Sequence, residues 1–287
     1  RQGRVALGPA DSPSLALGLM DKSFQAGASR DAILRMDDEA VADMFQWQSV
    51  LIREGVVNPG LVKQRWNEER IRQGFQTGEI FLAEGTQMDA FAIHGNGTKE
   101  MPGRLADPED MGLAVMPRGA SLRLDARGLP LREGRRGVGT RGWWWGVTIR
   151  APDRALAFKL ARHLGSTGSQ IEESTAFGMV PVRQDLLGEL GLMFGGGWTS
   201  EVFQAASQQL VENRHNIHPL IEEYDEVARN YAEAFREICL SSSSQKTRLE
   251  DIREVLDNRF VPVQRRILGD KYPVRAVSRA TPAENPP

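Results

Sequence analysis

Three consecutive tryptophans stand between two glycines in the stretch RGWWWGVTI, residues 141–149, in a chain with six tryptophans. We read this stretch as a strand, whose successive side chains point to opposite faces. Trp143 and Trp145 would share one face and Trp144 the other. Large flat indoles beside glycines suit the apolar face of a sugar ring, whose hydroxyls seek polar partners. From the residues alone, core and ligand platform both stay open, although we expect Trp145, further along the strand, to enter the core.

A second motif lies just before the tryptophans. Gly137, Gly139 and Gly142 have the G-x-G-x-x-G spacing of a dinucleotide-binding turn. That chemistry requires a strand before the glycines and a helix after them, so that the helix N-terminus meets the pyrophosphate. Here arginines precede the glycines and the predicted strand follows. We therefore expect a flexible loop and no cofactor.

The histidines and the cysteine do not predict a metal site. His215 and His218 lie in HNIHP with Glu222 nearby, but Pro219 would disrupt a helix carrying both histidines. We expect solvated or capping histidines. The single Cys239 excludes an intramolecular disulfide, and its helical setting FREICL favours a buried thiol.

Paired acids give no catalytic pattern either. Glu172–Glu173 and Glu222–Glu223 are adjacent in the sequence, so they cannot face each other on a helix. GLMFGGGWTS lacks the nucleophile-elbow pattern. No enzyme hypothesis therefore has a motif behind it.

Composition indicates an ordinary soluble globular protein. The 287 residues are 40% hydrophobic and 26% charged. The formal charge of -2 gives no global attraction for nucleic acid or an anionic membrane, so we expect no nucleic-acid partner. No apolar run approaches the roughly 20 residues of a membrane span.

Hydrophobic periodicity predicts short strands interleaved with helices, which indicates an α/β architecture. We expect helices over 37–54, 59–73, 156–164, from 200 onward and over 249–260, strands over 80–83, 111–119 and 141–149, and a hairpin or loop over 120–142.

The order of several stretches resembles a known family. They are WNEERIRQGFQTGEIFLAEGTQM, GLAVMPRG, RGWWWGVTI, ALAFKLARHLGSTGSQIEESTAFGMVPVRQDLL and HPLIEEYDEVARNYAEAFREI. Together they resemble the extracellular solute-binding proteins of ABC transporters (family 1), the group that binds sugars. Each motif is weak, and the ordered set is the stronger signal.

The resemblance implies a periplasmic-binding-protein-like type II fold, with two α/β lobes, hinge strands and a ligand cleft that closes by rotation. It also implies that the N-terminal part of the first lobe is missing. On this reading the segments are 1–85 in the second lobe, 86–165 in the first lobe with hinge strands, 166–240 as second-lobe C-terminal helices, and 241–287 as an extra helix and a disordered tail.

The same resemblance assigns the ligand-binding residues. Trp143 falls at the family's G-G-W tryptophan, with Gly142 allowing close approach and Trp144 beside it. The other carried-over positions are Gln87 after the first hinge strand, Arg183 in the P-V-R turn as a donor to hydroxyls or a carboxylate, and Tyr224 at the late helix. Arg141 and Gln87 depart from the family pattern and make the site more polar, which suits a charged or unusual ligand.

The resemblance implies binding without catalysis. The protein would be a periplasmic or extracellular receptor, either free or lipid-anchored. It would capture a carbohydrate and deliver it to the permease subunits of an ABC transporter. We expect a monomer with no metal. Two alternatives stay open, an enzyme using cleft carboxylates such as Asp185 or Glu84, and a protein-interaction module that uses the tryptophans.

Overall fold

The residues that the structure describes are mostly helical, with 61% helix and 3% strand. The α/β two-lobe type II fold with hinge strands is therefore wrong. The computed structural model describes residues 5–6, 14–58, 60, 63–95, 99, 103, 105, 107–139, 145–187, 197–213, 218–219, 221–241 and 246–269.

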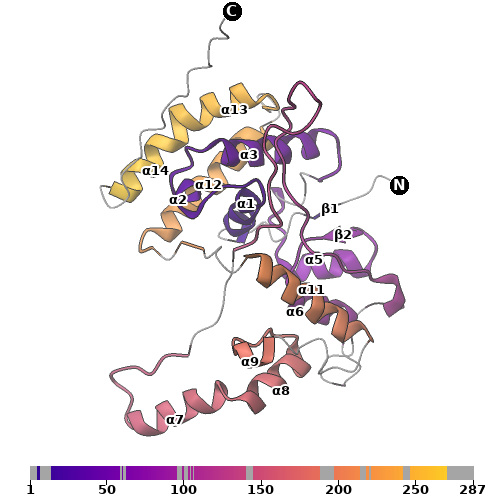
Figure 1. Ribbon diagram of the computed structural model, residues 1–287, viewed down its shortest axis with the longest axis vertical. Coiled ribbons are helices and arrows are strands. Elements are labelled where there is room, and N and C mark those ends of the chain that lie inside the picture. Colours follow the sequence, from indigo (N-terminus) through magenta and orange to yellow (C-terminus); the bar gives the residue numbers. More distant parts are fainter. Residues whose placement is uncertain are drawn as a thin grey trace, which may run out of the picture.

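The largest core lies in a helical body made of helices from the early and late parts of the chain (Figure 1). Its helices are α1 (Ser14–Gln25), α2 (Arg30–Arg35), α3 (Glu39–Arg53), α12 (Tyr224–Phe235), the π-helical turn η2 (Arg236–Leu240), α13 (Leu249–Val255), the π-helical turn η3 (Leu256–Phe260) and α14 (Val261–Leu268). Phe24, Phe45, Tyr231 and Phe235 are fully buried in it. Helices distant in sequence thus share one apolar interior.

Local signals explain why α3 begins and ends where the sequence predicts. The Asp38 side chain accepts a hydrogen bond from the Ala40 N–H at 2.7 Å, and Gly55, which follows the helix, has φ 72°. A capping carboxylate and a glycine in the left-handed region are common helix-end devices. The predicted helix over 37–54 is confirmed.

A smaller part of the molecule contains α5 (Glu68–Gln76), α6 (Gln87–His94), α11 (Gly197–Asn213) and the parallel pair of strands β1 (Val5–Ala6) and β2 (Leu82–Ala83). Trp66, Ile71 and Ile80 form one apolar cluster here, and Phe91 packs with residues of α11 in another. Only Leu82 and Ala83 of the predicted 80–83 strand pair with another strand.

The segment over 111–119 was predicted as a strand, and none forms there. Its Met116 N–H donates to the Gln209 side-chain oxygen at 3.0 Å, and Pro117 has no N–H to offer a ladder. After the short 3-10 turn η1 (Pro108–Asp110), the chain therefore runs along α11 without a strand partner. The predicted hairpin that follows is confirmed by the bridges Ala120–Glu133 and Leu124–Pro130.

A third group of helices lies at the far end of the molecule from α13 (Figure 1). It comprises α7 (Arg154–Leu164), α8 (Thr167–Phe177) and α9 (Gln184–Leu187). Leu187 and Val180 pack against the cluster of α6 and α11, whereas α7 has no buried residue. The helix predicted over 156–164 is confirmed, but its apolar face is not covered.

Candidate functional site

The described end of the tryptophan stretch is open to solvent. Trp145 is 66% exposed, so the expectation that it enters the core is wrong. Residues 145–148 form neither helix nor strand, and the backbone beyond them bonds locally: the Ala151 N–H donates to the Thr148 carbonyl at 3.2 Å. The Ile149 carbonyl accepts from the Arg154 Nε at 3.1 Å. The predicted strand therefore does not form over the part that can be seen. Gly142, Trp143 and Trp144, like Arg141, lie outside the described residues.

The other carried-over residues belong to three different helical groups. Gln87 is the first residue of α6, Arg183 immediately precedes α9, and Tyr224 is the first residue of α12. The Tyr224 hydroxyl lies 3.9 Å from the Met20 sulfur, so this ring packs against α1. Figure 1 shows α12 apart from α6 and α9, and among the described residues only α9 and α6 contact a common cluster, through Leu187 and Phe91. The described contacts do not bring these side chains into one site.

Arg183 already has a carboxylate partner. Its Nε donates to Asp185 Oδ1 at 2.9 Å and its Nη2 to Asp185 Oδ2 at 2.7 Å, a two-bond arrangement. Hydrogen bonding from Arg183 lowers the pKa of Asp185 below its ordinary value. A sugar hydroxyl would have to compete with this carboxylate for the guanidinium group.

The two described glycines of the G-x-G-x-x-G motif, Gly137 and Gly139, pack closely against Phe24 of α1 and against His218. A Cβ on Gly137 would lie 2.6 Å from the Phe24 carbonyl carbon, and one on Gly139 would overlap the His218 ring. The Gly139 N–H donates to the Asp21 carboxylate, and the Val138 N–H donates to Asn213 Oδ1 at 3.0 Å. Both glycines are buried. The segment is held by these bonds, so its described part is not the flexible loop that we expected.

His218 is buried as well, so a solvated histidine is the wrong expectation at this position. Its Nε2 lies 2.9 Å from Asp21 Oδ1, and its ring meets Phe24 edge-on at 6.0 Å between centroids. His215 lies outside the described residues. No group of three potential metal ligands is present among the residues that the structure describes. The His218–Asp21 contact fixes the glycine segment between α1 and the chain that leads to α12.

The thiol of Cys239 is inert in this setting. It is 1% exposed, and burial raises its pKa well above the ordinary value. Its sulfur lies 3.6 Å from the Phe45 carbonyl oxygen. Because the thiolate is the nucleophilic form, this environment disfavours reaction. The predicted buried thiol is confirmed.

A buried carboxylate that the sequence reasoning missed lies under the hairpin. Asp43 of α3 is 1% exposed, with Ser121 Oγ 3.3 Å from its Oδ1 and Arg132 Nη2 3.3 Å from its Oδ2. Burial raises the pKa of Asp43 despite the opposing charges of Arg132 and Arg123. The signal in the sequence was an aspartate between the apolar positions Val41 and Met44. The cluster fastens the hairpin to α3.

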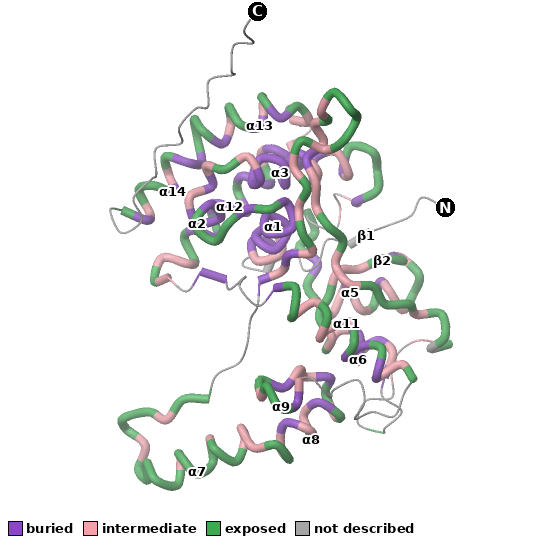
Figure 2. The backbone as a smooth tube through the Cα atoms, in the orientation of Figure 1, coloured by how far each residue is buried: buried purple, intermediate pink, exposed green. Residues whose placement is uncertain are grey.

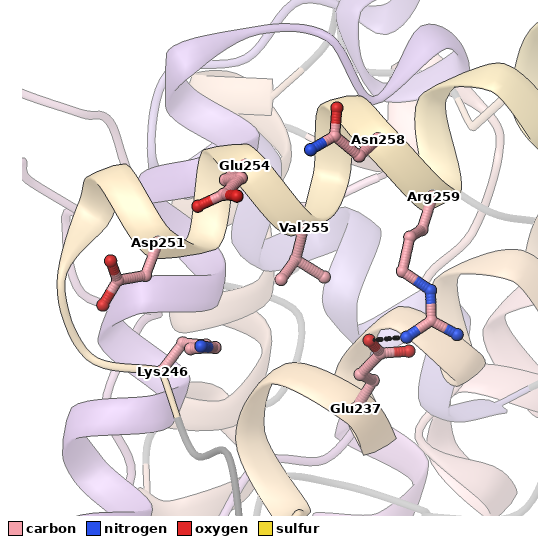
Figure 3. A pocket seen from close by; sticks show the side chains of 7 residues that line it. All are labelled: Glu237, Lys246, Asp251, Glu254, Val255, Asn258 and Arg259. Carbon is pink, nitrogen blue, oxygen red and sulfur yellow. Dashed lines mark hydrogen bonds and ion pairs between the residues drawn. The ribbon is translucent and has the colours of Figure 1, made fainter.

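The described residues also line a hollow of about 430 Å³ beside η2, α13 and η3 (Figure 3). Glu237, Lys246, Asp251, Glu254, Val255, Asn258 and Arg259 form its wall. Arg259 and Glu237 form an ion pair across one side of it. The wall mixes both signs of charge and contains no aromatic ring. It therefore offers neither a stacking face for a sugar nor a field of one sign for an ion.

No family model, curated protein or solved structure matches this chain.

Proposed function

We propose that this chain is a carbohydrate-binding protein that captures its ligand without altering it. The observation that supports this is the 66% exposure of Trp145 at the end of the tryptophan stretch. An indole keeps a broad apolar face in water at a free-energy cost, and stacking on the C–H face of a sugar would remove that face from water. The proposal does not depend on the two-lobe fold.

The delivery step is the second part of this proposal. The ordered motifs that resemble sugar-binding receptors of ABC transporters support a monomeric receptor, outside the cytoplasm, that hands the sugar to membrane permease subunits. The contacts of the two carboxylates considered for an enzyme lend that alternative no support. Glu84 pairs with Lys22 of α1, and Asp185 pairs with Arg183 beside α9. These ion pairs lie in different parts of the fold, and the described contacts do not place the two carboxylates across one pocket.

A sugar library tests the capture step by thermal unfolding of the whole chain. A sugar at 100 times its Kd stabilises the folded state by about 2.7 kcal/mol, which gives a readable rise in Tm. Chromatography of the sugar after incubation shows whether it has been altered. If no sugar in the library raises the Tm, the capture proposal is contradicted. If the incubated sugar is converted to products, the enzyme alternative replaces capture.

A matched pair of variants tests the role of the indole. Trp145→Ala is expected to weaken sugar binding by about tenfold, equivalent to about 1.4 kcal/mol. Phe81→Ala removes an aromatic ring that is 63% exposed in another part of the molecule and is expected to leave binding unchanged. Equal affinities for Trp145→Ala and the unsubstituted chain would place the sugar elsewhere.

A further inference from the structure

α7 exposes an apolar surface that the rest of the described chain does not cover. Leu156 is 63% exposed, Phe158 61% and Leu160 56%, and Ile149 just before the helix is 80% exposed. Its main neighbour is α8. Figure 1 shows α7 at the outer edge of the molecule, and in Figure 2 most of its length is exposed and none of it is buried. Solvated apolar groups gathered in this way mark a surface that binds something.

The same segment is locally basic, although the whole chain has a formal charge of -2. Arg150, Arg154, Lys159 and Arg162 are exposed, and Asp153 is the one acid between residues 149 and 164. The Asp153 carboxylate is occupied as the helix cap, accepting from the Leu156 N–H at 2.9 Å. None of the four basic side chains pairs with a carboxylate among the described residues. Their charge is therefore available to an outside partner.

Helical geometry places two of the basic groups along the edges of the face that carries Leu156 and Leu160. At 100° per residue, Leu156 and Leu160 lie one turn apart on the same side, and Lys159 lies next to them. Arg154 borders the other edge, beyond Ala157 and Ala161, and Phe158 and Arg162 lie on the remaining side of the helix. Long basic side chains at the edges of an apolar face can reach lipid headgroups while that face enters the acyl boundary.

We propose that α7, with residues 149–153 before it, docks on an anionic lipid surface. Charge complementarity favours this occupant, since a neutral or basic partner would leave the bordering arginine and lysine unused. The helix would lie in the plane of the interface. None of the helices in the described part of the chain has the length and apolar character to cross a bilayer. The tests of this surface leave Trp145 intact, so their failure is distinguishable from a failure of sugar capture.

The test is co-sedimentation of the whole chain, without sugar, with vesicles of phosphatidylcholine alone or mixed equally with phosphatidylglycerol. Binding is expected only to the mixed vesicles and is expected to weaken as salt is raised. Binding to neither kind of vesicle overturns the proposal. Equal binding to both kinds overturns the charge argument that carries it.

Charge variants keep the test independent of folding, because the altered groups are exposed. Lys159→Gln with Arg162→Gln is expected to weaken partition to the mixed vesicles by about 25-fold, roughly fivefold for each charge. The control, Arg127→Gln with Arg248→Gln, removes two other basic groups whose side chains are 80% and 75% exposed, and is expected to partition unchanged. An equal loss in both double variants would overturn a site at α7.

An apolar variant separates lipid from a protein surface. Leu160→Ser is expected to weaken partition by about tenfold while Tm and monomer mass stay unchanged. A fall in Tm without vesicle binding would show that this face packs within the chain. A dimer in light scattering that Leu160→Ser dissociates, again without vesicle binding, would replace the lipid with a second copy.

Discussion

Gly139 is a residue at which the fold leaves no room for a side chain. A Cβ there would overlap the His218 ring, which is fixed by its contact with Asp21. Gly139→Ala is therefore expected to lower the free energy of unfolding by about 1–3 kcal/mol, through overpacking. Urea unfolding measures this. The control is Gly112→Ala, where nothing lies within 4 Å of the added Cβ, and its effect is expected to stay within about 0.5 kcal/mol. Similar losses in the two variants would contradict the close packing at Gly139.

Asp43 makes stability depend on pH. Because burial raises its pKa above the ordinary 3.8, the folded state keeps a proton that the unfolded state releases. The stability that Asp43 contributes therefore falls as pH rises from the pKa of its unfolded state to the higher pKa of its folded state. Asp43→Asn cannot ionise, so its Tm relative to the unsubstituted chain is expected to rise between about pH 3 and about pH 6.

Asp125 supplies a control of opposite sign. Backbone hydrogen bonds, first from Leu129 and then from Arg127, lower the pKa of Asp125, so its contribution is present above its unfolded pKa and lost as pH falls. The Tm of Asp125→Asn relative to the unsubstituted chain is expected to fall over the same interval. If the two variants gave the same slope, the assignment of burial as the dominant effect at Asp43 would be wrong.

At the scale of elements, α6 depends on a reciprocal cap. The Asp89 N–H donates to Thr86 Oγ1 at 3.3 Å, and the Thr86 N–H donates to Asp89 Oδ2 at 2.8 Å. Thr86→Ala removes one arm and is expected to cost about 1 kcal/mol in urea unfolding. Thr167→Ala changes an exposed threonine that starts α8 but is not its cap, and it should cost less than about 0.5 kcal/mol. Equal costs would mean that the cap contributes nothing particular to α6.

Helices such as α3, α7 and α12 could be predicted from the sequence, but α1, α2 and α6 were not predicted, and most of the predicted strands did not form. A helix closes its hydrogen bonds within one segment, so the periodicity and the cap at Asp38 sufficed for α3. A strand needs a partner that a local pattern does not reveal. At 111–119 the N–H of Met116 went to the Gln209 side chain, and at 145–149 the backbone bonded to its own turn and to Arg154.

The environment of a candidate residue could be predicted where its residue type and its local sequence determine its burial. Cys239 in an apolar helix became a buried thiol. His218 was misjudged because its partner, Asp21, lies 197 residues earlier in the chain. Trp145 was misjudged because the period of a strand was assumed and the strand did not form. A contact between distant segments decided the error at His218, and local backbone bonding in place of a strand ladder decided the error at Trp145.

At the scale of the whole molecule, the main core is complete only with the last described helices, α13 and α14. Gln264 of α14 is fully buried; it donates to the Leu34 carbonyl at 2.6 Å and accepts from Asn230 at 2.8 Å, which links α14 to α2 and α12. The segment after residue 241 therefore contributes core packing as well as the predicted extra helix. Its buried apolar side chains are Leu249, Ile252, Leu256, Phe260, Val261 and Leu268.

Truncation after Ser241 tests this dependence. Each of those six buried side chains contributes about 1.5–3 kcal/mol, so together they match a typical total stability of about 5–15 kcal/mol. The truncated chain is expected to lose its cooperative thermal transition. Truncation after Gly269 removes none of these side chains and is expected to keep the Tm of the full chain. A cooperative transition after the shorter truncation would show that α1, α2, α3 and α12 form a core without α13 and α14.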